Sequence, residues 1–208
     1  MSMYAYTISR QYFKYRTFLS YFAVFTMLFN GGIVPSYIIN TSLLHLNDTL
    51  FILFLPLMVN AFYIIVMRTF FRRSIPDAVI ESAKLDGAHE FTILFRIVMP
   101  MAKPALATIG LFLVVELWND WFHGLLYITK PELTSLQYLL TKIQNTLEFL
   151  RSSTTISGSA HVLELIQTIP TESGRMALTV FVMTPTLFAY PFFQRYFVRG
   201  LTVGAVKG

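Results

Sequence analysis

Residues 81–100 read ESAKLDGAHEFTILFRIVMP and form the only long amphipathic segment that lies between two strongly apolar ones. The pattern predicts two short helices hinged at Gly87, because an Asp-Gly pair is a common helix stop and glycine readily adopts a left-handed conformation. For the first helix we expect Ser74 as the cap, Pro76 in the first turn and Asp77 near the positive end of the helix dipole.

The second helix of this segment carries an apolar stripe. Its members recur at i, i+3, i+4 and i+7, the spacing of one helical face: Phe91, Leu94, Phe95 and Val98. Pro100 and Pro104 are expected to end this helix before the next apolar run begins. We call the two helices together, residues 76–100, the elbow.

The composition is that of a polytopic membrane protein rather than a soluble domain. Of 208 residues, 55% are hydrophobic and 13% are charged, and the mean hydropathy is +0.58. The absence of cysteine excludes a disulfide framework and thiolate chemistry. A net charge of +5 could suggest nucleic-acid binding, but the basic residues cluster beside apolar runs, so we expect no nucleic-acid partner.

Four apolar runs approach the length of about 20 residues that a bilayer-spanning helix needs: 18–39, 49–71, 105–127 and 176–197. They predict an all-α, polytopic membrane helix bundle with four spans. The connections on one side hold twelve basic residues and those on the other side hold four. The excess places both termini and the loop 72–104 in the cytoplasm, where the elbow would be available to a partner.

Polar residues within the second and third runs are candidates for a translocation path. Asn60 could face a solute or form a hydrogen bond to another helix, and the sequence favours neither role over the other. Glu116, Asn119 and Asp120 share one predicted helical face with His123, between Trp118 and Trp121. Such groups nearly always face a bundle interior or a water-filled cavity. We favour a structural or path-lining role, with a proton relay and a metal site as alternatives.

The connection 128–175 is expected to lie outside the membrane. Leucine and isoleucine recur at helical spacing over 136–143, which predicts an amphipathic helix on the membrane surface or on a partner. A second short helix is expected over Val162–Ile166.

The elbow resembles the EAA loop of bacterial ABC importer permeases, whose pattern is Glu-Ala-Ala, three residues, Gly, nine residues, Ile, one residue and Leu-Pro. This sequence departs from the pattern at Ser82 and Met99. The resemblance implies that the loop couples to an ATPase through Glu81, Ser82, Ala83, Asp86, Gly87, Ile97 and Pro100.

Most of the chain is similar to the maltose-type carbohydrate-uptake permeases. The similarity lies in the Trp118-Asn119 pair and in the tail 197–208. Residues 30–35 and 67–71 resemble the oligosaccharide permeases of Gram-positive bacteria, a branch of the family whose members are associated with plant polysaccharides. Permeases of this family have six spans, so we expect residues 1–208 to correspond to the C-terminal two-thirds of one permease transmembrane domain, as a fragment, a misplaced start or a truncation.

The resemblance also implies an assembly in a bacterial cell membrane. Its expected members are a second homologous permease, two ATPase subunits and an extracellular solute-binding lipoprotein. The chain has no G-x-x-x-x-G-K-[ST] loop, so ATP and magnesium would belong to the ATPase and this chain would bind no cofactor and be no enzyme.

Two other functions stay open on the sequence. The elbow would serve equally in an ABC permease for a peptide, amino acid or anion, because it does not contact the solute. A proton-coupled carrier would use Glu116, Asp120 and His123 and would need no ATPase. A membrane-embedded enzyme is disfavoured, because the sequence offers no set of nucleophile, base and orienting residue.

Overall fold

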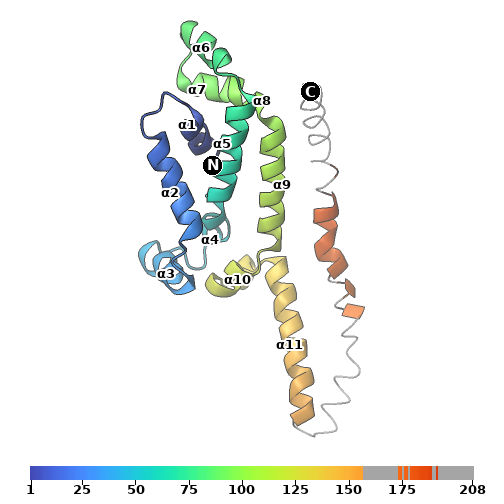
Figure 1. Cartoon of the computed structure of the whole chain (residues 1–208). Helices are drawn as coiled ribbons and strands as arrows, with labels where there is room; N and C mark the ends of the chain where they lie inside the picture. Colours follow the sequence, from blue (N-terminus) through green and yellow to red (C-terminus); the bar gives the residue numbers. More distant parts are fainter. Residues whose placement is uncertain (157–172, 175, 178, 189–190, 192–208) are drawn as a thin grey trace.

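The computed structural model describes residues 1–156, 173–174, 176–177, 179–188 and 191. These residues are mostly helical and contain no strand (Figure 1), which agrees with the expected all-α class. The tail 197–208 and the helix expected over Val162–Ile166 lie outside the described residues, as do residues 178, 189–190 and 192–197 of the fourth apolar run.

The first half of the chain forms short helices around two longer ones. Their bounds are α1 (Ser2–Ser9), α2 (Arg16–Leu28), α3 (Ile33–Ile38), the π-helix η1 (Ile39–Leu43), α4 (Leu50–Phe54), the 3-10 helix η2 (Pro56–Met58) and α5 (Ala61–Ser74). The elbow then comprises α6 (Asp77–Leu85), α7 (Glu90–Thr92), the π-helix η3 (Ile93–Val98) and α8 (Met99–Met101).

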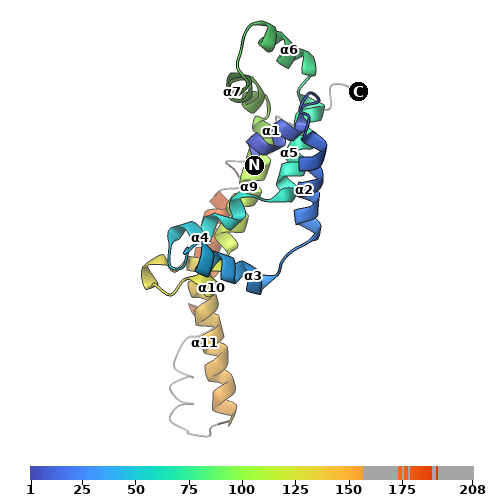
Figure 2. The same ribbon diagram turned by 90° about the vertical axis from the view of Figure 1, so that its left-hand side faces the viewer.

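The second half of the chain begins with the longest apolar helix and ends, in its well-described part, with a helix that extends away from the rest of the molecule. It comprises α9 (Lys103–Asn119), α10 (Phe122–Tyr127), the 3-10 helix η4 (Pro131–Leu133) and α11 (Leu136–Ile156), with a further helical segment at Thr179–Phe188. The elbow helices α6 and α7 lie at one end of the molecule and α11 extends from the opposite end (Figures 1 and 2).

No single helix in the described part of the chain is both long and apolar enough to cross a bilayer, but three bent helix pairs meet that test of length and composition together. The pairs are Arg16–Leu28 with Ile33–Leu43, Leu50–Met58 with Ala61–Ser74, and Glu90–Met101 with Lys103–Asn119, bent by 111°, 46° and 80°.

The first three apolar runs are therefore not continuous helices, as the sequence had suggested, and each break has a local cause. At the first, Gly32 adopts a φ of 90° and its N–H bonds to the Asn30 side chain. At the second, Asn60 accepts hydrogen bonds from the N–H groups of Phe62 and Tyr63 and begins α5 anew. The third run breaks at Asp120, whose extended backbone ends α9. This break is separate from the 80° bend, which lies at the start of α9.

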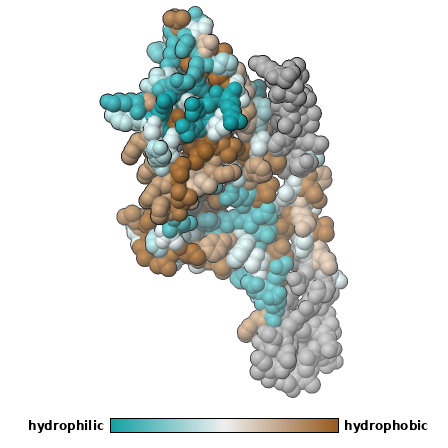
Figure 3. All heavy atoms as spheres, in the orientation of Figure 1, coloured by the Kyte–Doolittle hydropathy of each residue, from teal (hydrophilic) through white to brown (hydrophobic). Residues whose placement is uncertain are grey.

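The main core joins α1, α5, the elbow and the start of α9. Its fully buried members include Ile8, Met67, Phe71, Ile93 and Val98. Figure 3 shows hydrophilic residues gathered at the end that carries α6 and α7, with an apolar band over the helices beside it. Because α1 packs against α5 in this core, the first residues of the chain form part of the elbow's support.

A smaller cluster closes the opposite end of the molecule. Ile52, Tyr127 and Ile128 are buried together there. Asp48 accepts hydrogen bonds from the backbone N–H groups of Thr129 and Lys130 at 2.6 and 3.0 Å, and from the Thr129 hydroxyl. These bonds hold the pKa of the Asp48 carboxyl below its ordinary value, and they join the loop before α4 to the loop after α10.

The packing of α10 on α11 depends on Gly124. A Cβ atom built on Gly124 would lie 3.0 Å from the Cβ atom of Tyr138. We expect Gly124→Ala to destabilise the protein by about 1–3 kcal/mol, the usual cost of overpacking, and to lower the midpoint of thermal unfolding in detergent. Gly31→Ala is the control, because its nearest neighbour would be Pro35 at 3.9 Å. Equal effects of the two substitutions would show that this contact does not constrain the fold.

Candidate functional site

The first elbow helix, α6, ends as the sequence predicts. Asp86 is its C-cap, and Gly87 follows with a φ of 79°. The Gly87 N–H bonds to the Lys84 carbonyl at 3.0 Å and the Ala88 N–H to the Ala83 carbonyl at 2.9 Å, the two bonds of a Schellman motif. Gly87 thus fixes the direction in which the chain leaves α6.

The predicted start of α6 is wrong in one respect. Ser74 does not cap the helix, because it is the last residue of α5 and its backbone is already helical. Pro76 takes the capping position with an extended backbone, and no side chain caps α6. Asp77 lies in the first turn, as expected.

The second elbow helix buries a different face from the predicted one. Leu94 and Val98 are buried as expected, but Phe91 and Phe95 are exposed, and Ile93 is buried in their place. The cause is the π-helical stretch η3, Ile93–Val98, which widens the turn so that residues five apart share a face. Pro100 does not end the helix, which continues to Met101.

The seven residues of the EAA pattern divide between the core and the surface. Ala83 is buried and Ile97 packs against the core. The remaining members are exposed on the elbow: Glu81, Ser82, Asp86, Gly87 and Pro100. Leu85, which the sequence reasoning did not single out, is 89% exposed beside them. The elbow therefore presents a small surface with an apolar centre at one end of the molecule.

A buried arginine attaches the N-terminal segment to the first elbow helix. Arg10, directly after α1, is 2% exposed. Its Nη1 atom lies 3.1 Å from the Oδ1 atom of Asp77, its Nη2 donates to the Phe71 carbonyl at 3.5 Å, and its guanidinium lies over the Tyr6 ring. Arg10 thereby links α1, the end of α5 and the first turn of α6.

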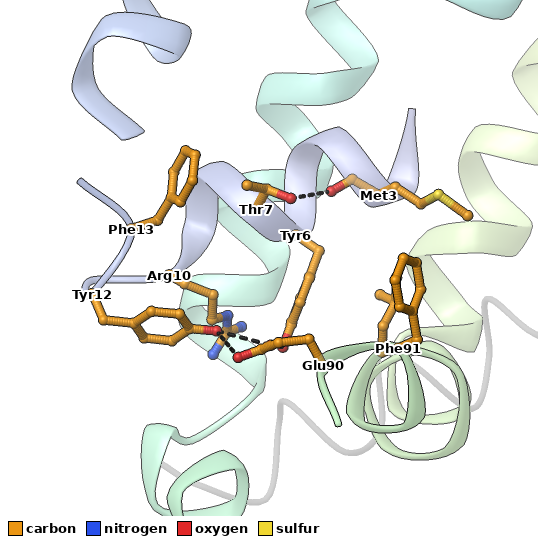
Figure 4. A pocket seen from close by; sticks show the side chains of 9 residues that line it. Met3, Tyr6, Thr7, Arg10, Tyr12, Phe13, Glu90 and Phe91 are labelled. Atoms are coloured by element: carbon orange, nitrogen blue, oxygen red, sulfur yellow. Dashed lines mark hydrogen bonds between the residues drawn. The ribbon is translucent and has the colours of Figure 1, made fainter. Parts of the chain in front are cut away.

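A second cluster attaches the same segment to the other elbow helix. The Glu90 carboxylate, at the start of α7, accepts hydrogen bonds from the hydroxyls of Tyr6 and Tyr12 at 3.1 and 2.9 Å (Figure 4). The Lys84 Nζ atom lies 2.6 Å from Glu90 and 3.5 Å from the centre of the Tyr12 ring. The cluster therefore joins both elbow helices to residues 6–12.

The contacts within this cluster shift the pKa values of its ionisable groups. Partial burial raises the pKa of the Glu90 carboxyl, but the hydrogen bonds from Lys84, Tyr12 and Tyr6 outweigh burial, and the net pKa is lowered. Burial, together with the Glu90 charge, raises the pKa of Tyr6. Lys84 also has a raised pKa, because the bonds to Glu90 and Tyr12 outweigh desolvation. The Lys84–Glu90 pair is thus charged at neutral pH.

The N-terminal segment and the elbow enclose a cavity of about 330 Å³ between them. Its lining is mainly apolar and aromatic and includes Met3, Tyr6, Phe13, Phe91 and Leu94 (Figure 4). The sequence pattern did not predict this arrangement, because residues 1–17 hold three basic residues and no acidic one and so indicate only a basic connection beside the first apolar run. The pattern of Tyr, Arg and Tyr at 6, 10 and 12 was the available signal, but nothing in it identifies Asp77 or Glu90 as partners.

The predicted polar face of the third apolar run does not exist as one helical face. The helix breaks at Asp120, which accepts hydrogen bonds from the Phe122 and His123 N–H groups and begins α10. The Asp120 Oδ2 atom also lies 2.6 Å from the His123 Nδ1 atom. Asn119 bonds to the Val115 carbonyl of its own helix. These residues hold the break in place and do not line up along α9.

The remaining candidates lie apart from that break. Glu116 accepts a hydrogen bond from the Tyr63 hydroxyl at 3.4 Å, which links α9 to α5. Asn60 serves as the cap of α5. In the described part of the chain, no group of three or more His, Cys, Asp or Glu residues could hold a metal ion.

Comparisons with known proteins match nearly the whole chain. The sequence model of a family described as "binding-protein-dependent transport system inner membrane component" matches residues 6–203. Protein LplC of Bacillus subtilis (strain 168) is 37% identical over 98% of this chain and 66% of its own length. The polygalacturonan/rhamnogalacturonan transport system permease protein YtcP of the same organism is 37% identical over 100% of this chain and 70% of its own length.

One solved structure is also similar. It is that of a bacterial ABC transporter involved in the import of the acidic polysaccharide alginate, with a TM-score of 0.74 and 32% identity, covering 93% of this chain and 66% of that one. The chain thus spans about two thirds of the length of LplC and of the alginate transporter chain.

Arg10→Met should destabilise the protein by about 1–3 kcal/mol, because it removes the buried guanidinium that donates to the Asp77 carboxylate, the Phe71 carbonyl and the Ser9 hydroxyl. Thermal unfolding in detergent measures the change, and limited proteolysis should show earlier cleavage between α5 and α6. Arg16→Met, at an incompletely buried arginine without an ion pair in the described residues, is the matched control. Equal stability of the Arg10 variant and the wild type would contradict this structural role.

The Lys84–Glu90 pair should make the attachment of the elbow sensitive to acid. Because the pKa of Glu90 is lowered in the folded protein, its contribution is complete above the unfolded pKa of about 4.3. The contribution is lost as the pH falls through the lower folded value. Glu90→Gln should cost only about 0.5–1 kcal/mol at pH 7, since solvent screens the half-exposed pair. Unfolding midpoints from pH 7 to pH 3 test this: the difference between variant and wild type should shrink on acidification, and a constant difference would contradict it.

Proposed function

Because the chain belongs to the family of binding-protein-dependent transport system inner membrane components, we propose that it is a membrane-spanning permease subunit of an ATP-driven ABC importer for a carbohydrate. The family is one of transport components and not of enzymes. The names of YtcP and of the alginate importer support an oligosaccharide as the solute. In this proposal ATP is hydrolysed by a separate ATPase, and this chain binds no nucleotide or other cofactor.

The elbow is the observation that carries this proposal. The buried Ile80 and Ala83 hold α6 on the core, while the opposite side of α6 exposes Glu81, Ser82 and Leu85. A helix that is anchored on one face and offers an isolated apolar side chain on the other is suited to insertion into a groove of a partner. We assign that partner as an ABC ATPase and residues 72–104 as the cytoplasmic coupling loop.

The contacts of the elbow suggest how movement would pass to the transmembrane helices. Closure of two ATPase subunits would push the elbow, and Arg10 would transmit that push to α1 and α5 through Asp77 and Phe71. The second elbow helix leads directly into α9 through a bend of 80°. A rigid elbow would therefore rock α5 and α9 together, as alternating access requires.

The rest of the assembly follows from the same proposal. The first two bent helix pairs, α9 with α10, and the fourth apolar run at 176–197 would form four spans of a bundle in a bacterial cell membrane, with both termini in the cytoplasm. A second homologous permease would complete the bundle, and an extracellular solute-binding lipoprotein would deliver the sugar. Asn60, Glu116, Asn119 and Asp120 would lie on or near the path of the solute.

The geometry does not support a proton-coupled carrier, since the break at Asp120 separates Glu116 from His123. Asp120 and His123 pair with each other, and Glu116 pairs with Tyr63 on another helix. We therefore retain only the ATP-driven importer.

Leu85→Asp should weaken copurification of the ATPase with the permease by about 30-fold or more, the cost of losing a central apolar contact, and should reduce ATP-driven oligosaccharide uptake in parallel. Because Leu85 is 89% exposed, the fold itself should be unaffected. Tyr15→Asp is the control, as Tyr15 is 60% exposed but lies outside the elbow.

Gly87→Asp should have the same effect for a different reason, because the φ of 79° strains any residue with a side chain and would change the direction of the elbow. If both uptake and ATPase copurification survive Leu85→Asp and Gly87→Asp, the elbow does not couple the permease to an ATPase.

A further inference from the structure

A groove at the end of the molecule opposite the elbow has the features of a sugar-binding site. It lies between α10 and α11, has a volume of about 280 Å³ and is lined in part by Trp121, Tyr138 and Phe149. Figures 1 and 2 place α11 at the far end from α6 in both views. If the elbow faces the cytoplasm, the groove faces the side from which a solute arrives.

The groove is held open by specific packing. Ser135 caps α11 by accepting the Tyr138 N–H at 3.2 Å, and its hydroxyl donates to the Asp120 carbonyl at 3.5 Å. The close approach of Gly124 to Tyr138 brings α10 against the first turns of α11. The break at Asp120 and the start of α11 therefore fix where Trp121 lies relative to α11.

Its lining combines aromatic surfaces with unpaired polar groups. The Trp121 side chain is 38% exposed. The Asn145 amide and the Lys142 ammonium, both exposed, make no hydrogen bond or ion pair with any residue that the structure describes. Aromatic side chains offer an apolar body to one face of a ligand, and the apolar C–H face of a pyranose ring matches such a surface. The amide and ammonium can then bond to its hydroxyl and acidic groups.

The charge and the shape of the groove further limit the class of ligand that it can bind. Among the lining residues that the structure describes, Lys142 is the charged one, and it gives this part of the groove a positive charge. It follows α11 from Tyr138 to Phe149, a rise of about 16 Å at about 1.5 Å per residue. A narrow, open groove of this volume, near the lower limit of about 300 Å³ for small-molecule sites, suits a short section of an extended chain rather than a compact molecule.

We propose that this groove binds a section of an acidic oligosaccharide, with Trp121 stacking on a sugar ring and Lys142 pairing with a sugar carboxylate. The inference rests on the proposed function and specifies its substrate class. Because Lys142 is exposed, the preference for a carboxylate is modest and weakens with salt. A weak outer site of this kind would hold the end of a long solute while the remainder enters the bundle.

The test uses the assembled transporter in nanodiscs, without a solute-binding protein, and two matched probes. Trigalacturonate carries the carboxylates, and its fully methyl-esterified form has the same rings without the charge. Dissociation constants come from saturation-transfer NMR at low salt. The wild type should prefer the acid about three- to fivefold, the size expected of an exposed ion pair, and Lys142→Gln should abolish this preference while leaving the affinity for the ester unchanged.

Trp121→Ala should weaken binding of both probes about five- to tenfold, because both stack on the ring. Lys130→Gln and Phe51→Ala are the matched controls, since they make similar changes at the same end of the protein but outside the groove lining. Both controls should bind the two probes as the wild type does.

Three results would overturn the inference. The first is no binding of either probe to the wild type, and the second is unchanged preference in Lys142→Gln. The third is unchanged sugar binding in the groove variants together with a weaker affinity for the solute-binding protein, which would make the groove a protein-docking surface.

ATP-driven import by the wild type, measured after adding the solute-binding protein, separates this inference from the proposed function. If the wild type imports the sugar but does not bind it in the groove, the groove is not a sugar site and the proposed function stands. Sugar binding without import would support the groove as a sugar site and reject the proposed function.

Discussion

The buried guanidinium of Arg10 is the interaction on which the elbow end depends. A cation removed from water is stable only when its donors are satisfied, and Arg10 finds acceptors in Asp77, in the Phe71 carbonyl and in Ser9. These partners belong to three different segments, so the requirement to satisfy one charge fixes α1, α5 and α6 relative to one another. The Glu90 cluster attaches α7 to the same N-terminal segment. Its Lys84–Glu90 ion pair is half exposed, so less free energy is needed to remove its charges from water. Together these contacts attach both elbow helices to α1 and α5.

The opposite end of the molecule depends on carboxylates that bond to backbone N–H groups. Asp48 holds the start of the loop after α10, and Asp120 begins α10 itself. Each satisfies backbone donors that a break in a helix leaves without partners. The breaks are therefore stable features of the fold, and the one at Asp120 sets the position of the groove between α10 and α11. The two ends are thus stabilised in different ways, the elbow end by a buried cation and the opposite end by carboxylates that accept backbone N–H groups.

Local signals predicted the elements of the elbow well and their packing less well. The Asp86-Gly87 stop was predicted because it depends on residues within one turn, and its Schellman bonds confirm it. The apolar stripe was half wrong, because η3 is π-helical and a period of 3.6 no longer describes it. The polar face from Glu116 to His123 failed for a similar reason, since an unbroken helix was assumed across Asp120. Both errors come from extending a regular period through a segment where side-chain bonding or packing changes the backbone.

The sequence by itself determined the all-α class, the apolar character, the elbow and the family, because composition, periodicity and fixed spacing are local properties of the chain. Only the tertiary structure decided which residues support the elbow, since Arg10 and Asp77 are distant in sequence and no spacing rule connects them. It also decided that Asn60 caps α5, that Asp120 accepts the N–H groups of Phe122 and His123, and that Trp121 and Lys142 line the same groove. The physical reason is the same in each case. A buried charge or an unpaired backbone group must find a partner in three dimensions, and many arrangements of the same helices could supply one.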